Sequence, residues 1–151
     1  MSELEYLGNK KLLKLAKTAF LASNTISSET VLHCYDWATE MCRQGQCVVS
    51  GFSSKLEKDV LHFLLKGNQP IIMVLARQMY KVVPMDLKEA LEQNRLLIIS
   101  TSHAVRQSRA TALARNRYVC EMADEIMLVG AAEGNSLFEL MEQYKEKIVS
   151  F

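Results

Sequence analysis

Short apolar runs alternate with helical patterns along most of the chain. Each run is almost continuously apolar, which is typical of strands that are covered on both faces of a parallel sheet. The runs fall at residues 18–22, 46–50, 70–75, 95–100 and 125–129. Because a helical stretch follows each of the first four runs, the pattern predicts stacked βαβ units.

The segments between the runs carry apolar residues at helical spacing. The first helix is expected to begin after an N-cap at Ser27 or Ser28 and to end just before Gly45. The same spacing predicts further helices that start near residues 56 and 87, and two more over residues 105–122 and 136–148.

These elements predict an α/β fold of the Rossmann-like, doubly wound kind, with helices on both faces of a mostly parallel five-stranded sheet. With the runs numbered in chain order, right-handed crossovers predict the strand order 3-2-1-4-5 and a switch point between the first and fourth strands. Ligands of such sheets bind at the carboxyl ends of the strands, beside that point. At 151 residues, the chain fits a single domain over 1–151.

Small polar residues stand where several of the predicted strands end. Ser23 and Asn24 follow the first run, Ser50 and Gly51 end the second, and Ser100 ends the fourth. Hydroxyl groups, backbone amides and helix N-termini at such a position can hold an anion. The pattern therefore predicts a phosphate-binding site at this edge of the sheet.

Composition narrows the classes of function. Apolar residues make up 49% of the chain and charged residues 23%, which excludes a disordered segment. The 18 Lys and Arg nearly balance the 17 Asp and Glu, so any grip on nucleic acid must come from a local patch. No apolar run approaches the ~18 residues of a membrane span, and the acidic N-terminus lacks a signal-type core, so we expect a cytoplasmic protein without a membrane partner.

The four cysteines show no metal-ligand spacing. None forms a C-x-x-C pair or has a histidine at zinc-ligand distance along the sequence, so we expect no metal site. We interpret the thiols as reduced and mostly buried. No cofactor is predicted.

The order of these motifs resembles the core of the DNA-processing protein A (DprA/Smf) family. The resemblance rests on Ser50-Gly51, on Arg115-Asn116-Arg117 before the last run, and on residues 6–13. It covers most of the chain, and residues 50–59 resemble the compact single-domain variant. Three turns depart from the family pattern. Ser23-Asn24 stands for Ser-Arg, residues 54–57 stand for x-Gly-Ile-Asp, and residues 134–137, which stand for Ser-Gly-Ser-Leu, carry an inserted Asn.

The resemblance implies a non-enzymatic protein that binds single-stranded DNA in recombination or DNA uptake, loads a RecA-type recombinase and forms a homodimer. It places Arg115 and Arg117 at the ligand crevice, where a guanidinium can grip phosphate with two hydrogen bonds. Asn116 between them is a further candidate for ligand binding, and the alternative is that it points inward and fixes the loop. The helix predicted over residues 105–122 contains other arginines, and a solvent-exposed helix face accounts for some of them. Glu57 occupies the family's acidic position, although the helix dipole favours an acid there in any case.

Three further residues complete the predicted site. Ser54 and Phe52 follow the second run, and Arg77 follows the third. Phe52 is also one of the few aromatic residues near the predicted loops, and single-stranded DNA usually stacks its bases on such rings. The shortage of aromatic residues and the near-neutral net charge of +1 count against DNA binding.

Two alternatives remain open. The first is a domain that binds or senses a small nucleotide, whose pocket would close around one ligand, whereas a DNA groove must continue across several loops. The second is an enzyme that cleaves an N-glycosidic bond with Glu57 as its acid or base, which needs a second acid that the sequence does not place. The Pro-Gly-Gly-x-Gly-Thr signature of the related LOG hydrolases is absent.

Overall fold

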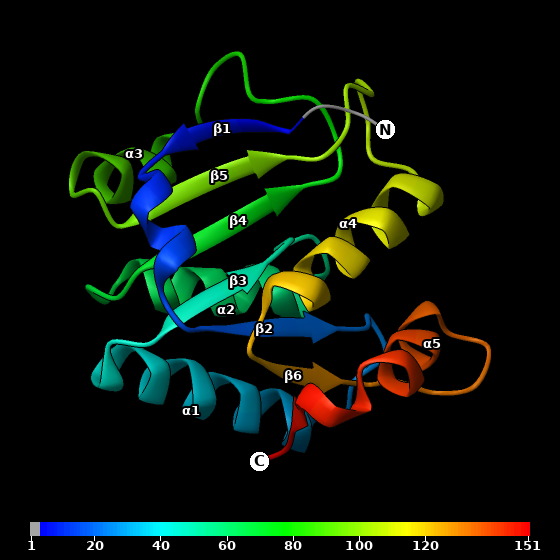
Figure 1. Ribbon diagram of the computed structural model, residues 1–151. Coiled ribbons are helices and arrows are strands. Elements are labelled where there is room, and N and C mark those ends of the chain that lie inside the picture. The colour runs from blue at the N-terminus through cyan, green and yellow to red at the C-terminus, as the bar shows by residue number, and fades with distance from the viewer. Residues whose placement is uncertain (1–3) are drawn as a thin grey trace.

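Seven strands form one mixed sheet in the computed structural model, which describes residues 4–151 (Figure 1). The strands are β1 (Glu5–Gly8), β2 (Lys17–Ala22), β3 (Cys47–Ser50), β4 (Ile71–Leu75), β5 (Leu96–Ser100), β6 (Glu125–Val129) and β7 (Ile148–Val149). Their order is β1-β5-β4-β3-β2-β6-β7, and β1 alone runs antiparallel to its neighbour. The Rossmann-like α/β fold is confirmed, but the sheet is larger than five strands and mixed.

The helices that connect the strands cover both faces of the sheet. They are α1 (Ser28–Gln44), α2 (Lys55–Leu65), α3 (Met85–Glu92), α4 (Arg109–Met122) and α5 (Ser136–Gln143), with short 3-10 helices at Lys10–Lys14 and Lys145–Lys147. Ser27 caps α1, and Gly45 ends it in the left-handed region, as the sequence predicts. The fourth helix begins later than predicted, because Ser108 and Thr111 form a capping box at its start.

The predicted strand order 3-2-1-4-5 is wrong. β5 pairs with β4 instead of β2, and β6 takes the place beside β2, so the five predicted runs lie in the order 4-3-2-1-5. The reason is that α3 packs on the same face as α1 and α2, and right-handed crossovers on one face carry the chain across the sheet in one direction. The direction reverses only when α4 crosses the other face. The switch point therefore lies between β2 and β6.

The sequence pattern did not predict the two edge strands, β1 and β7. β1 is largely exposed and carries no continuous apolar run. The predicted last helix over 136–148 ends at Gln143, and β7 follows the short 3-10 helix as a two-residue strand beside β6. Edge strands of this kind are covered on fewer sides, so they lack the apolar pattern of the central strands.

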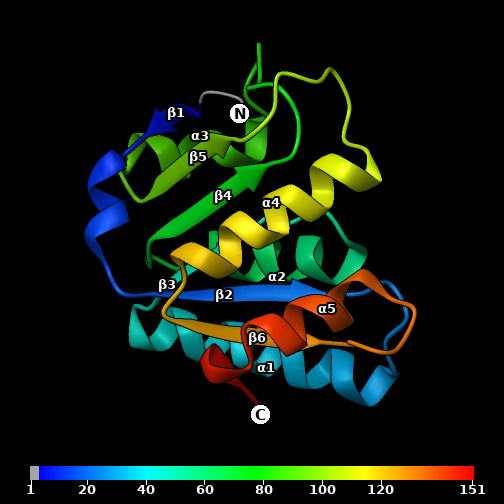
Figure 2. The same cartoon turned by 45° about the vertical axis from the view of Figure 1, so that its right-hand side comes forward.

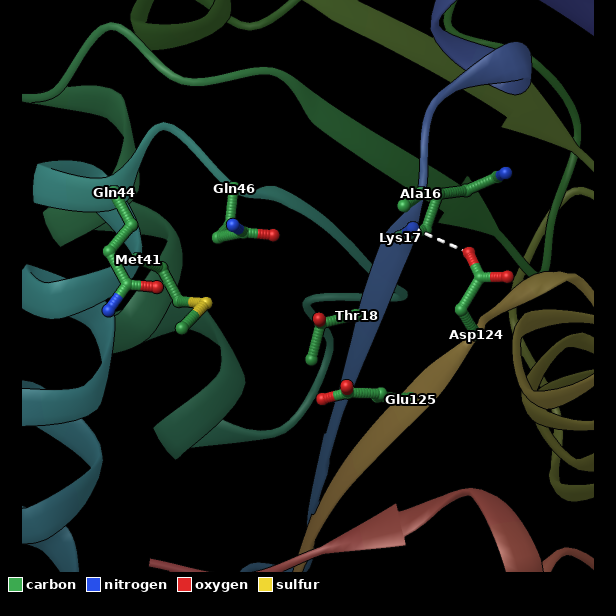
Figure 3. A pocket seen from close by; sticks show the side chains of 8 residues that line it. All are labelled: Ala16, Lys17, Thr18, Met41, Gln44, Gln46, Asp124 and Glu125. Carbon is green, nitrogen blue, oxygen red and sulfur yellow. Dashed lines mark hydrogen bonds between the residues drawn. The ribbon is translucent and has the colours of Figure 1, made fainter.

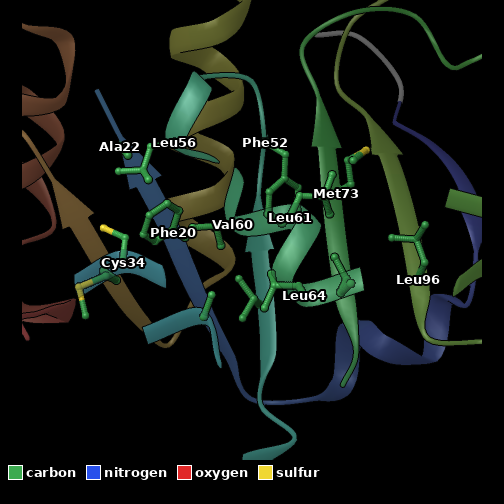
Figure 4. Packing of buried hydrophobic residues seen from close by; sticks show 14 of the residues in the cluster. Phe20, Ala22, Cys34, Phe52, Leu56, Val60, Leu61, Leu64, Met73 and Leu96 are labelled. Carbon is green, nitrogen blue, oxygen red and sulfur yellow. The ribbon is translucent and has the colours of Figure 1, made fainter. Parts of the chain in front are cut away.

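Alternate residues of the strands enter two separate cores. Phe20 and Met73 face α1, α2 and α3, where they pack with Leu64 and other apolar residues (Figure 4). Leu21 and Val74, one residue further along the same two strands, face α4 and α5 instead. The two layers of helices are best seen in Figure 2, where α4 and α5 lie in front of the sheet and α1 lies behind it. This double coverage explains why the central strands read as uninterrupted apolar runs.

The thiols are free, and three of the four are buried. Burial raises the pKa of Cys47 and Cys120 to about 12 and that of Cys34 to about 11. Cys42 is partly exposed, and its pKa is also raised by burial. Within residues 4–151 no three metal-ligating side chains gather into a group that could hold an ion. In the same residues, no helix combines the length and apolarity that a bilayer crossing needs.

We expect the native protein to show at most one rapidly reacting thiol at pH 8, that of Cys42. The three buried thiols should react with a disulfide reagent about a thousandfold or more slower than a free cysteine, because little thiolate forms and access is blocked. The measurement is a time course with such a reagent, with all four thiols released in denaturant as the control. Rapid reaction of several thiols in the native protein would contradict this burial.

Candidate functional site

A polar pocket opens at the carboxyl edge of the sheet, beside the switch point between β2 and β6. Its volume is about 420 Å³, and it lies between the loops after β2 and β3, the start of α4 and the turn before α5. The polar and charged residues that line it are Ser23, Asn24, Thr25, Ser53, Ser54, Glu57, Gln107, Arg109, Arg115, Asn116, Asn135 and Ser136. Of the residues predicted from sequence, this polar pocket brings together Ser23, Asn24, Ser54, Glu57, Arg115 and Asn116.

Arg115 forms the floor of the polar pocket and is itself only 2% exposed. Its Nη2 donates to Ser53 Oγ at 3.0 Å, its Nη1 donates to the carbonyl of Val74 at 3.2 Å, and its Nε donates to Asn116 Oδ1 at 2.8 Å. Burial lowers the pKa of the Arg115 guanidinium, and the Glu57 carboxylate acts in the opposite direction. Arg115 therefore ties α4 to β4 and to the loop after β3, and it contributes positive charge from beneath the pocket.

Gly51 makes room for this buried guanidinium. A Cβ atom on Gly51 would stand 2.3 Å from both Cζ and Nη1 of Arg115. The glycine is thus required by the close approach of a side chain from α4. The sequence interpretation of Gly51 as a phosphate-binding residue stays a prediction, since the glycine does not line the polar pocket.

Glu57 holds two loops together at the wall of the pocket. Its Oε2 accepts from the backbone N–H of Ala22 at 3.0 Å, and its Oε1 accepts from those of Ser53 at 2.9 Å and Ser54 at 3.3 Å. Ser54 in turn caps α2 and completes a capping box with Glu57. Both carboxylate oxygens are thus occupied by backbone donors, and Glu57 is only 3% exposed.

The glycosidase alternative needs a second acid near Glu57. Among the described residues that line the polar pocket, Glu57 is the one carboxylate. A pair of carboxylates is the usual requirement for this chemistry, so the pocket offers no support for that reading.

Asn24 and Asn116 complete the polar wall. Asn24 is exposed, and its Oδ1 accepts from the backbone N–H of Lys55 at the start of α2, at 3.1 Å. Asn116 is partly exposed, and its Oδ1 accepts the hydrogen bond from Arg115 Nε. Ser23 is also partly exposed and forms a hydrogen bond of 3.4 Å with the carbonyl of Thr25. These side chains keep free polar surface toward the pocket.

Ser50 and Phe52 lie behind the pocket, inside the protein. Ser50 is fully buried, and its Oγ accepts from the backbone N–H of Phe52 at 3.1 Å. Phe52 is 4% exposed and lies in the core beside Leu61 (Figure 4). Phe52 therefore offers no ring to a base at the surface.

Arg77, Ser100 and Arg117 lie away from the polar pocket. Ser100 is buried, and its Oγ hydrogen-bonds the carbonyl of Arg77 at 2.6 Å, which joins the loops after β4 and β5. Arg77 itself lies over the ring of Tyr80 at 5.4 Å. The true strand order explains this separation, because β4 and β5 stand on the far side of β3 from the switch point. Arg117 is exposed and lies 4.0 Å from Glu139 on α5.

Sequence reasoning missed three important residues of the pocket. Arg109 is exposed at the first position of α4, and Asn135 and Ser136 stand at the start of α5. Asn135 caps α5, since its Oδ1 accepts from the backbone N–H of Leu137 at 2.7 Å. Cap signals in the sequence mark both helix starts, but only the fold brings these starts to one pocket.

The polar pocket continues into two neighbouring hollows. One of them, of about 150 Å³, shares Ser23 and Asn24 with the pocket and runs between the starts of α1 and α2. The other, of about 360 Å³, shares Arg109, Asn135 and Ser136 and runs between α4 and α5. The three hollows adjoin one another through these shared residues at the carboxyl edge, and we call them together the edge groove.

A separate hollow of about 220 Å³ lies at the opposite edge of the sheet (Figure 3). Lys17 and Asp124 meet there, where the backbone N–H of Lys17 donates to Asp124 Oδ2 at 2.8 Å. The Lys17 ammonium group donates hydrogen bonds to the backbone carbonyls of Leu13 and Leu15. This hollow lies at the amino ends of the strands, where none of the five α-helices within residues 4–151 begins, so the carboxyl edge is the better candidate for the site.

Several solved structures share this fold. The DNA processing protein A of Helicobacter pylori superposes with a TM-score of 0.76 and 21% identity, over 97% of this chain and 70% of that protein. The DNA processing protein A of Streptococcus pneumoniae gives a TM-score of 0.77 and 19% identity, over 97% of this chain and 54% of that protein. A molybdenum cofactor binding protein of Rippkaea orientalis is more distant, with a TM-score of 0.61 and 9% identity over 90% of this chain and 76% of its own.

The sequence itself carries the family assignment. No curated protein matches the chain significantly. The family described as DNA recombination-mediator protein A, however, matches residues 2–138, which is most of the chain. The resemblance inferred from the motifs is therefore confirmed, and the chain belongs to the DNA recombination-mediator protein A family.

Proposed function

We propose that this protein binds single-stranded DNA along the edge groove and acts in DNA recombination. The proposal rests on the extended shape of the site. Three adjoining hollows share lining residues, and together they span four loops at the carboxyl edge of the sheet. A strand of several nucleotides fits an open groove, whereas a single nucleotide favours a closed pocket. The family supports this reading, and the Helicobacter pylori protein binds single-stranded DNA.

The charges at the centre of the groove suit a phosphate backbone. Arg109 is exposed there and forms no ion pair with any residue in 4–151. The buried Arg115 adds a second positive charge beneath it. The starts of α2, α4 and α5 also converge on the polar pocket, and each contributes the partial positive charge of a helix N-terminus. The net charge of +1 is thus compatible with a local anion site.

We expect Arg109→Ala to weaken DNA binding and to make it less sensitive to salt. If Arg109 neutralises one phosphate, the slope of log affinity against log salt should become shallower by about 0.7, the value for one contact to a single strand. The measurement is a fluorescence-anisotropy titration with a single strand of about 20 nucleotides, long enough to fill an extended groove, at several salt concentrations. Arg109 is preferred to Arg115 because the removal of the buried Arg115 would also disturb the fold.

Arg43→Ala is the matched control. Arg43 is an exposed arginine in the last turn of α1, and its side chain pairs with Glu40 near the opposite edge of the sheet. Its removal changes the net charge equally but should leave DNA affinity and the salt slope unchanged. Saturable binding of one nucleotide without any DNA binding would instead favour the small-nucleotide alternative. The homodimer and the contact with a RecA-type recombinase stay predictions.

A further inference from the structure

The hollow between α4 and α5 differs in chemistry from the polar pocket that it adjoins. Phe138 and Leu113 form its apolar part, and Arg109 marks the boundary with the polar pocket. Glu139 also lines the hollow, and Arg117 approaches its carboxylate at 4.0 Å. A phosphate would be attracted by Arg109 and repelled by Glu139, and the apolar surface of Phe138 and Leu113 suits an uncharged occupant.

Phe138 is not used by the core of the protein. Leu137 and Leu140 on the same helix are buried and pack against the sheet, whereas Phe138 is only partly buried. Among the described residues, neither core cluster includes Phe138 or Leu113. An aromatic ring that lies outside both core clusters and lines an open hollow is available to a ligand.

On the basis of the proposed function, we infer that Phe138 is a stacking platform for a base of the bound single strand. The phosphate of that nucleotide lies near Arg109, and the base turns away from it onto the ring of Phe138, with Leu113 on the other side of the hollow. Base stacking on an aromatic ring is the usual partner of backbone charge in proteins that bind single strands without sequence preference. Phe138 supplies the aromatic platform that the buried Phe52 cannot provide.

Phe138→Leu tests this platform, because it removes the ring and keeps an apolar side chain of similar reach. We expect it to lower the affinity for a single strand of about 20 nucleotides about five- to a hundredfold, the range that stacking of one base produces. Phe138→Trp should retain the affinity, and the fluorescence of the new tryptophan should be quenched by DNA beyond any change seen with Trp37 alone. Phe151→Leu is the matched control, since Phe151 is 56% exposed and lies against His33 outside the groove.

A strand of the same length with abasic sites separates stacking from other effects. The wild-type protein and Phe138→Leu should bind this strand equally, because no base reaches the ring. Equal losses on both strands would show that the substitution acts through the fold, and wild-type affinity of Phe138→Leu for the ordinary strand would show that no base stacks there. Either result overturns the inference and leaves the proposed function standing, provided that Arg109→Ala still weakens binding. If the wild-type protein binds no single strand at low salt, both fail together.

Discussion

Gly51→Ala should destabilise the protein by about 2–4 kcal/mol, although it adds a single methyl group. The new Cβ would stand 2.3 Å from the Arg115 guanidinium, which is far inside van der Waals contact. A flexible side chain at a surface would simply move aside. Arg115 cannot do so cheaply, because it is 2% exposed and donates hydrogen bonds to Ser53, Val74 and Asn116. Displacement would leave buried groups unpaired, which costs about 1–3 kcal/mol each.

Urea unfolding of Gly51→Ala, Arg115→Ala and the double variant measures this contact. If the methyl group acts against the guanidinium, Gly51→Ala should cost much less in the Arg115→Ala background, with a coupling of about 2 kcal/mol. Gly45→Ala provides a control, because nothing lies within 4 Å of its Cβ and only the left-handed backbone is strained, at about 1 kcal/mol. Equal effects of Gly51→Ala in both backgrounds would show that the methyl group meets something other than Arg115.

Glu57→Gln should destabilise the protein by about 2–4 kcal/mol, because hydrogen bonds to a buried charged group contribute about 1.5–3 kcal/mol each. Both carboxylate oxygens accept from backbone N–H groups, at Ala22 on one side and at Ser53 and Ser54 on the other. A glutamine can offer an oxygen to only one side and must turn its own donor toward the other. The substitution also removes the negative charge that partly compensates the buried Arg115.

Glu29→Gln is the matched control for this experiment. Glu29 is likewise an acid in the first turn of a helix, but it is exposed and lies in α1. Its substitution should cost at most about 1 kcal/mol, the value of a charge interacting with the helix dipole. The measurement is the free energy of unfolding in urea for both variants. Comparable losses at the two positions would mean that Glu57 acts only through the helix dipole and does not join the loops.

Glu57 and Arg115 show where prediction of the site from sequence succeeds and where it stops. The family resemblance placed Arg115 at the ligand crevice and made Glu57 a candidate through the family's acidic position, and both residues line the polar pocket. Their burial and hydrogen bonds depend on Ala22 and Val74, which are 35 and 41 positions away in the sequence. A local sequence pattern does not reveal hydrogen-bond partners at such a separation. A buried residue that stabilises the site therefore cannot be distinguished in the sequence from a residue that is exposed to a ligand.

Arg109 and Phe138 illustrate the reverse case. Both stand near helix starts that the sequence marks with capping residues, and neither was predicted to belong to the site. They meet in one hollow because α4 and α5 pack on the same face of the sheet. Arg77 was expected at the site and lies elsewhere for a related reason, since β4 is separated from the switch point by β3.

The sequence by itself determined the central strands, the connecting helices and the polar edge of the sheet, because burial on both faces, helical spacing and capping residues leave local signals. It also carried enough of the family's motifs for the family to be identified. The tertiary structure alone decided the strand order, the two edge strands and the membership of the pocket. These features depend on which face each crossover helix covers and on which distant residues then meet, and such contacts leave no periodic pattern in the chain.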